Sequence, residues 1–218
     1  MKEHIFKPLK IGPVVSKNRI EVAPAAPFLA GHDTSVTPEF YEYTMQLARS
    51  GAGIVTIGVT NIEPVGSRTL SAGSRMYMSD LNDLAEGIKR YGALASIELV
   101  SSRYMLSPPE KVVGGTSTED VEALIRGFAE AAALCGDAGF DMIMIHGGHG
   151  NVPAMFYNKK FNARADRFGD RSRFGIELLT AIRERTRGKL AVEYRISAEE
   201  MLPDMTTFEE TLEYAAAI

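Results

Sequence analysis

Cysteine is almost absent from this chain of 218 residues, and several other features are missing with it. The one cysteine, Cys135, excludes an internal disulfide framework and any iron–sulfur cluster held by this chain alone. No stretch approaches the roughly 18 uninterrupted apolar residues of a membrane span, and the amino terminus has no apolar signal core. The net charge is −4 with scattered basic residues, which favours neither nucleic acid nor an anionic membrane as a partner. We therefore expect a cytoplasmic protein in a reducing setting.

The chain is organised around Phe140–Asn151, which reads FDMIMIHGGHGN. Its apolar run, Met142–Ile145, predicts a strand buried on both faces, as in a parallel sheet. The glycines that follow let the backbone turn sharply and approach a ligand closely. His146 and His149 would then lie at the carboxyl end of a parallel strand, where α/β proteins commonly place functional groups. The alternative is a glycine-rich turn whose histidines only bond nearby backbone.

Strand and helix patterns alternate five times along the chain, which predicts a parallel sheet with right-handed crossovers and no domain boundary. The second strand leads into a loop through Pro64–Ser67, and the longest irregular stretch, Ser101–Gly115, is either a functional lid or a surface connector. The predicted strands begin at residue 20 and span residues 53–58, 93–100, 142–145 and 190–197. The predicted helices span residues 38–50, 80–91, 118–135 and 173–185, and the fifth starts at residue 207.

Helix starts carry capping residues, and one long helix carries an apolar stripe. Thr37 is a predicted N-cap with Pro38 at the tolerated first position, and Ser79 or Asp80 is predicted to cap the second helix. Residues 116–119 resemble a capping box for the third. The residues that recur after it at helical spacing are predicted core: Val121, Leu124, Ile125, Phe128, Ala132 and Cys135.

Five blocks of the sequence together resemble one known family. They are Phe6–Gly12, Lys17–Pro24, Ala48–Thr56, Ala138–Gly150 and Asn162–Gly169. The resemblance is to the old yellow enzyme, or NADH:flavin oxidoreductase, family, which includes bacterial enoate and 2,4-dienoyl-CoA reductases. It implies a TIM-type (β/α)8 barrel with FMN over the carboxyl ends of the strands. About five βα units would be present in one FMN-binding domain, residues 1–218, apparently incomplete at its carboxyl end.

The resemblance also implies which residues contact the flavin. Glu98 stands where the family often has a glutamine facing the ring, and Arg195 matches the arginine beside the pyrimidine edge of the ring. A cation there would stabilise the negative charge that gathers near N1 on reduction. Backbone contacts to FMN are expected at Ala23, Pro24 and Ala25, and at Gly58 or Val59.

His146 and His149 match the pair that bonds a substrate carbonyl in this family. Two donors at that oxygen stabilise an enolate more than the ground state. The implied function is transfer of hydride from NAD(P)H via FMN to an activated C=C bond of an enone, enoate or enoyl-CoA. A metal site is the rival interpretation of His-x-x-His, but it needs a third ligand, and no further histidine lies nearby in sequence.

The sequence departs from the family at the position of the proton donor. The tyrosine usually found there is replaced by Asn151, whose amide cannot deliver a proton at neutral pH. Either water, Tyr104 or Tyr157 protonates the α-carbon, or the protein runs a different half-reaction. The segment before Arg103 also lacks the family's histidine and glycine.

Five units are fewer than the eight of a closed barrel, and an open sheet leaves a pairing edge. The sequence therefore represents an amino-terminal part of a longer protein, one part of a barrel completed by a second chain, or a decayed relative. Rival functions are a non-catalytic fragment that needs a partner and a flavin-free barrel lyase that uses His146 and His149. Expected partners are a small unsaturated carbonyl substrate and either a second copy or a complementing barrel segment.

Overall fold

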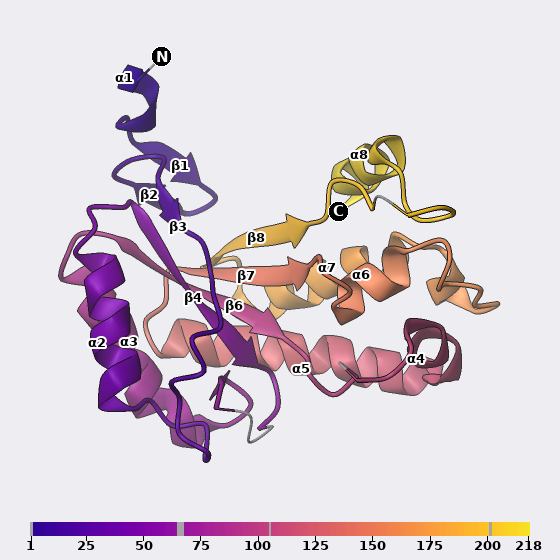
Figure 1. The fold of residues 1–218 in the computed structure, drawn as a ribbon, viewed down its shortest axis with the longest axis horizontal. Coiled ribbons are helices and arrows are strands. Elements are labelled where there is room, and N and C mark those ends of the chain that lie inside the picture. Colours follow the sequence, from indigo (N-terminus) through magenta and orange to yellow (C-terminus); the bar gives the residue numbers. More distant parts are fainter. Residues whose placement is uncertain (1, 65–67, 105, 201) are drawn as a thin grey trace.

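The computed structural model describes residues 2–64, 68–104, 106–200 and 202–218. Most of the loop predicted at Pro64–Ser67 lies outside these residues. Within them, five strands form a continuous parallel path in the order β3-β4-β6-β7-β8, and the short β5 pairs with the end of β4 (Figure 1). The strands are β3 (Glu21–Val22), β4 (Ile54–Asn61), β5 (Leu70–Ser71), β6 (Leu94–Val100), β7 (Met142–Gly147) and β8 (Ala191–Ile196).

One helix follows each strand of the path, as the βα alternation predicts. These helices are α2 (Pro38–Ala48), α3 (Met78–Lys89), α5 (Thr118–Asp137), α7 (Arg173–Thr186) and α8 (Phe208–Ala217). Shorter pieces lie between them: α1 (Lys2–Ile5), α4 (Pro109–Gly115), α6 (Val152–Tyr157) and the 3₁₀ turns η1 (Arg75–Tyr77) and η2 (Arg167–Gly169). No described helix is long and apolar enough to cross a membrane.

The sheet curls, and its two faces differ in composition. We call the face that packs against the helices the convex face and the opposite one the concave face (Figure 1). Because side chains alternate along a strand, every second residue belongs to the convex face. Its strand residues join the main hydrophobic core with α3, α5 and α7: Val55, Ile57, Ala95, Ile97, Leu99, Ile143 and Ile145. Burial of this layer is the main source of the sheet's stability.

The amino-terminal hairpin covers one end of the concave face. Its strands β1 (Leu9–Ile11) and β2 (Val14–Ser16) pair antiparallel. Ile11 and Val14 pack against a small cluster formed where the parallel strands begin, containing Ile54, Met142 and Ala191. The hairpin therefore covers the end of the curled sheet at which the parallel strands begin.

Most of the predicted elements are confirmed, with shifts of a few residues at their ends. Thr37 caps α2 by accepting a hydrogen bond from the Phe40 amide, and Ser117 caps α5 in the same way with Asp120. Thr207 forms a complete capping box with Glu210 at the start of α8. The predicted stripe of α5 is buried throughout, including Cys135, whose thiol pKa is raised by burial to about 12.

Two sequence-based expectations are wrong. Neither Ser79 nor Asp80 caps α3, because the 3₁₀ turn η1 leads straight into this helix and Ser74 caps that turn instead. The stretch Ser101–Gly115 is not irregular throughout, since it contains α4. Pro109 opens α4 at its first position, where a missing amide proton costs nothing.

Candidate functional site

Three polar side chains meet at the carboxyl end of the concave face. Glu98, His146 and Arg195 come from the neighbouring strands β6, β7 and β8, and the register pairs His146 with Arg195. Glu98 Oε1 lies 3.3 Å from His146 Nδ1 and 3.3 Å from a guanidinium nitrogen of Arg195. The Glu98 side chain is 2% exposed, whereas that of Arg195 is 36% exposed. The carboxylate is thus a buried hub between an imidazole and a cation that reaches solvent.

Burial sets the charge states at this hub. It raises the pKa of Glu98, an effect that the nearby charge of Arg195 opposes. The pKa of His146 falls to about 4, mainly through burial and further through the charges of Arg195 and His149. His146 is therefore neutral at pH 7. Its Nδ1 is close to Glu98 without hydrogen-bond geometry, so this buried nitrogen has no partner among the described residues.

His149 lies on the turn that follows β7. Its φ of 52° is left-handed, and Gly150 continues the turn with a φ of 71°. The backbone amide of His149 donates to Ser197 Oγ at 3.3 Å, which ties the turn to the end of β8. The imidazole is exposed and lies edge-on to that of His146, with ring centroids 5.1 Å apart. The two histidines therefore form one cluster, as the sequence predicts.

Asn151 occupies the next position, at the start of α6. Its side-chain amide donates to the Gly148 carbonyl at 3.4 Å rather than capping the helix. Together with Ser101 and His149 it lines a cavity of about 90 Å³. The residue that replaces the family's tyrosine is thus beside His149, within the same site.

Gly58 and Pro24 complete the floor of the site. β4 has an irregular register between Ile57 and Thr60, where Gly58 lies. A Cβ atom added to Gly58 would lie 2.8 Å from Pro24 Cβ and 2.9 Å from Glu98 Oε2. Glycine is required here because the loop after β3 and the Glu98 side chain pack too closely against this position to admit a side chain. Ala25 lines a small crevice with Gly58, and Ala23 is exposed on the same loop.

The predicted site residues are therefore brought together to different degrees. Pro24, Gly58, Glu98, His146 and Arg195 form a connected arrangement, and His149 and Asn151 extend it.

Of the two tyrosines considered as proton donors, Tyr157 is buried between α6 and α8. Its ring stacks on Tyr214 at a centroid distance of 4.0 Å, and its hydroxyl is enclosed. Tyr104 is half-buried after β6 with the Arg103 guanidinium over its ring.

Polar residues deeper on the concave face were missed by the sequence analysis. Glu21 on β3 accepts a hydrogen bond from Thr56 Oγ1 at 2.5 Å, and burial raises the pKa of Glu193 on β8 to about 7. Ser96 on β6 is fully buried. The available signal was a polar residue at every second position of an otherwise apolar strand.

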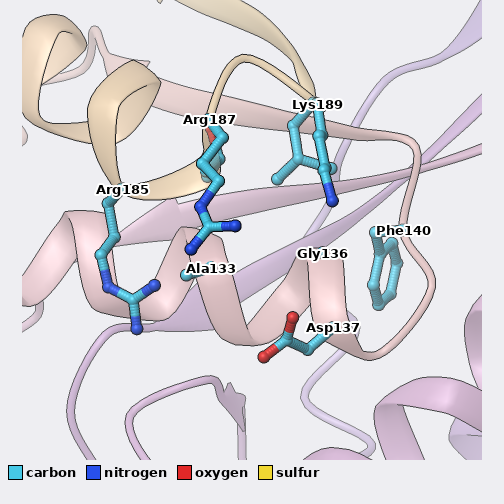
Figure 2. A pocket seen from close by; sticks show the side chains of 9 residues that line it. Ala133, Gly136, Asp137, Phe140, Arg185, Arg187 and Lys189 are labelled. Carbon is cyan, nitrogen blue, oxygen red and sulfur yellow. The ribbon is translucent and has the colours of Figure 1, made fainter.

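A larger pocket lies away from this cluster, at the opposite end of the strands. It has a volume of about 460 Å³ and is formed by the end of α5 and the turn before β8. Figure 2 shows Arg185 at the end of α7 and Arg187 and Lys189 on the turn that follows, on the side of α5 where Asp137 lies. These charged side chains are exposed, and Arg185 is paired with Glu130. Because parallel barrels place their chemistry at the carboxyl ends of the strands, this pocket is not the candidate site.

Metal binding has little support in the described part of the chain. There, no group of three or more histidine, cysteine, aspartate or glutamate side chains is arranged to hold an ion. His146 and His149 have Glu98 nearby, but it is engaged with Arg195.

Solved structures share this fold. A 2-naphthoyl-CoA reductase complex superposes with a TM-score of 0.87 at 21% identity, covering 99% of this chain and 38% of the other. The old yellow enzyme from Pichia sp. AKU4542 gives a TM-score of 0.86 at 19% identity, covering 98% and 65% respectively. The predicted barrel architecture is confirmed, with this chain forming part of the barrel.

Proteins with similar sequences include NADH and NADPH oxidoreductases. An NADH oxidase of Thermoanaerobacter brockii is 27% identical over 95% of this chain and 36% of its own length. An NADPH dehydrogenase of Geobacillus sp. (strain WCH70) is 28% identical over 99% of this chain and 69% of its own length. The chain thus spans between about one third and two thirds of these relatives. The sequence model of one family matches residues 4–107 and 109–218, and the chain belongs to that family, the NADH:flavin oxidoreductase / NADH oxidase family.

Proposed function

We propose that this chain binds the flavin ring of an FMN-dependent oxidoreductase that passes hydride from NAD(P)H to an activated C=C bond. We call the carboxyl end of the concave face, where Glu98, His146 and Arg195 meet, the mouth. The observation that carries the proposal is the hub at Glu98, whose Oε1 lies 3.3 Å from both His146 and Arg195. Family membership supplies the class of cofactor and of reductant. A cinnamate reductase of Clostridium sporogenes, 26% identical over 92% of this chain and 35% of its own length, supports an unsaturated carboxylic or carbonyl substrate.

The residues at the mouth suit a flat flavin ring. At Gly58 any side chain would collide with Pro24 and Glu98, so glycine keeps the backbone of β4 close to both. Arg195 offers a partly exposed cation, and His146 Nδ1 is a buried polar atom without a partner. The FMN phosphate in such barrels is usually bound by loops after the seventh and eighth strands. The contacts expected from these five strands are therefore with the ring.

The charges at the mouth would act on a bound flavin. When bound, FMN supplies the hydride that reduces the substrate. Arg195 would hold positive charge beside the pyrimidine edge, although part of that charge is offset by Glu98 at 3.3 Å. A carboxyl here, where the family often has a neutral glutamine, makes the charge of the site depend on the protonation of Glu98.

His146 and His149 would bind the substrate carbonyl. At neutral pH the buried His146 is uncharged and donates as a neutral imidazole. The two imidazole rings lie edge-on with centroids 5.1 Å apart, so one substrate oxygen could contact both. Two N–H donors aimed at one oxygen stabilise it best when it carries negative charge, so the pair favours the enolate over the ground state.

Protonation of the α-carbon would not come from Asn151, because an amide is not an acid at neutral pH. Tyr157 is enclosed between α6 and α8, which leaves water or Tyr104 as the source. Further partners under this proposal are a second copy of the chain or a segment that completes the barrel.

Stopped-flow measurement of the two half-reactions tests the proposal in flavin-loaded protein. NADH or NADPH should bleach the flavin absorbance, and cyclohexenone should then restore it slowly. Asn151→Tyr should accelerate only the second step, by up to about 10²–10⁴-fold, since that is the usual worth of general acid catalysis. If neither NADH nor NADPH lowers the flavin absorbance, the proposed oxidoreductase function is wrong. An equally fast enone step in both proteins would show that another donor replaces the tyrosine.

A further inference from the structure

A second polar group lies deeper in the concave face, below the mouth. Glu21 and Glu193 come from β3 and β8, the two ends of the parallel path, yet their carboxyl groups lie close enough for Glu21 to raise the pKa of Glu193. Thr56 Oγ1 donates to the other side of the pair, at Glu21 Oε1. The curl of the sheet thus brings two acidic side chains from its opposite edges into contact across the concave face.

Among the described residues, this carboxyl pair has neither a counter-charge nor enough hydrogen-bond donors. Glu193 Oε2 is buried and has no hydrogen-bond partner among the described residues. Ser96 is 0% exposed, and its hydroxyl also has no partner there. Ser96 stands in register with Thr56, so its side chain lies on the same concave face as Thr56, which donates to Glu21. The concave face thus carries two buried polar atoms, Ser96 Oγ and Glu193 Oε2, that have no partner among the described residues.

The cation on the same strand does not neutralise the pair. Arg195 lies two residues beyond Glu193 and contacts Glu98 at 3.3 Å. Along the described strands the concave face carries three carboxyl groups, those of Glu21, Glu98 and Glu193, against this single guanidinium. Glu98 is buried and Glu21 and Glu193 are half-buried, and carboxyl groups in such excess are stabilised either by taking up a proton or by a paired cation.

We propose that the concave face binds the closing part of the barrel through a basic side chain, a lysine or arginine, that inserts between Glu21 and Glu193. Barrel interiors are built in layers of four side chains from alternate strands. Glu21, Ser96 and Glu193 come from the first, third and fifth strands of the path and make up three members of one layer. The fourth member comes from a strand beyond the free edge of β8. A metal ion fits less well, because the described residues offer no third acidic, histidine or cysteine ligand.

The probe for this site is methylguanidinium, with urea as an uncharged control and tetramethylammonium as a cation without N–H donors. The full chain is labelled with ¹³C at the glutamate carboxyl carbon, and the pH midpoint of Glu193 is followed by NMR. Methylguanidinium should lower that midpoint, and the controls at equal concentration should not. Flavin is absent from the experiment, so its outcome is independent of the proposed function.

Variants localise the effect. Glu193→Gln should weaken methylguanidinium binding about tenfold, which corresponds to about 1.4 kcal/mol, while the exposed Glu209→Gln should leave binding unchanged. If Glu193→Gln does not fold, the Glu193 midpoint in the unaltered chain decides the question. The proposal is overturned if methylguanidinium shifts that midpoint no more than urea does, or if it binds Glu193→Gln as tightly as the original chain.

Discussion

The two faces of the sheet are built from alternating residues of the same strands, and they differ in how completely their contacts are satisfied. On the convex face, Val55, Ile97 and Ile143 are fully buried against helices of this chain. On the concave face, Ser96, His146 and Glu193 each carry a buried polar atom without a partner among the described residues. The convex face therefore holds the fold together, whereas the concave face keeps polar atoms that the described residues do not pair.

The largest expected difference between the faces appears at two neighbouring residues of β7. Ile143 belongs to the convex core, and Met144 faces the concave side. Ile143→Ala should cost about 2–5 kcal/mol of unfolding free energy, because it leaves a cavity in a closed core. Met144→Ala should cost less than half as much, because Met144 is buried but lies outside the main core formed with the helices. Urea denaturation followed by circular dichroism measures both, and equal losses would contradict the comparison.

Arg195→Ala tests the mouth of the concave face. In flavin-loaded protein, loss of this cation should lower the flavin reduction potential and weaken FMN binding by about 1.5–3 kcal/mol. Arg187→Ala, which removes an exposed arginine at the opposite end of the strands, serves as the matched control. Spectroelectrochemistry gives the potential. If Arg195→Ala binds flavin and the flavin reduction potential is unchanged, Arg195 does not act on the flavin.

His146 and His149 should serve the ligand and not the cofactor. Replacing either with alanine should weaken the binding of p-hydroxybenzaldehyde by about 1–3 kcal/mol for each lost hydrogen bond, while flavin stays bound. The exposed His4→Ala is the control. Titration of the charge-transfer absorbance measures the affinity. If all three variants bind the aldehyde equally well, the two histidines do not bind ligand and serve only the glycine-rich turn.

The smallest expected effect is a pH dependence of stability. The folded-state pKa of Glu193 is raised to about 7 from its usual 4.5, so the folded state binds this proton more tightly than the unfolded state does. Protonated Glu193 contributes its full share to the free energy of unfolding below pH 4.5. This contribution is lost as the pH rises through 7.

His146 acts in the opposite direction, because its pKa is lowered to about 4 and its contribution is lost as the pH falls below 6.5. The difference between the original chain and Glu193→Gln isolates the glutamate. Melting temperatures should favour the original chain more at pH 5 than at pH 8. A difference that does not change with pH would show that Glu193 titrates normally.

The convex face was the more predictable of the two. The stripe of α5 and the apolar runs of the strands report burial directly, because residues that share a helix or strand also share a face. The hairpin β1–β2 was missed, since strands of three residues are too short to show alternation. The short helix α6 was missed for a similar reason, with only six residues and a proline near its start.

The concave face was predictable only through resemblance. Glu98 and Arg195 are 97 residues apart, and nothing local in the sequence indicates that their side chains meet. The contact between Glu21 and Glu193 depends on the curl of the whole sheet, which brings together strands from its two ends. Pairing of this kind is set by register and curvature, neither of which a single sequence reveals.

The most direct test of the account is whether the mouth of the concave face binds the flavin ring. The chain is titrated against FMN and against lumiflavin, which has the ring without the phosphate, and fluorescence quenching is recorded. Both compounds should bind the original chain and Gly114→Ala, whose added methyl group meets nothing within 4 Å. Gly58→Ala should bind both at least about tenfold more weakly, or about 1.4 kcal/mol, because its Cβ would collide with Pro24 and Glu98 and displace them. Absence of quenching by the original chain, or equal binding by Gly58→Ala, would contradict the claim.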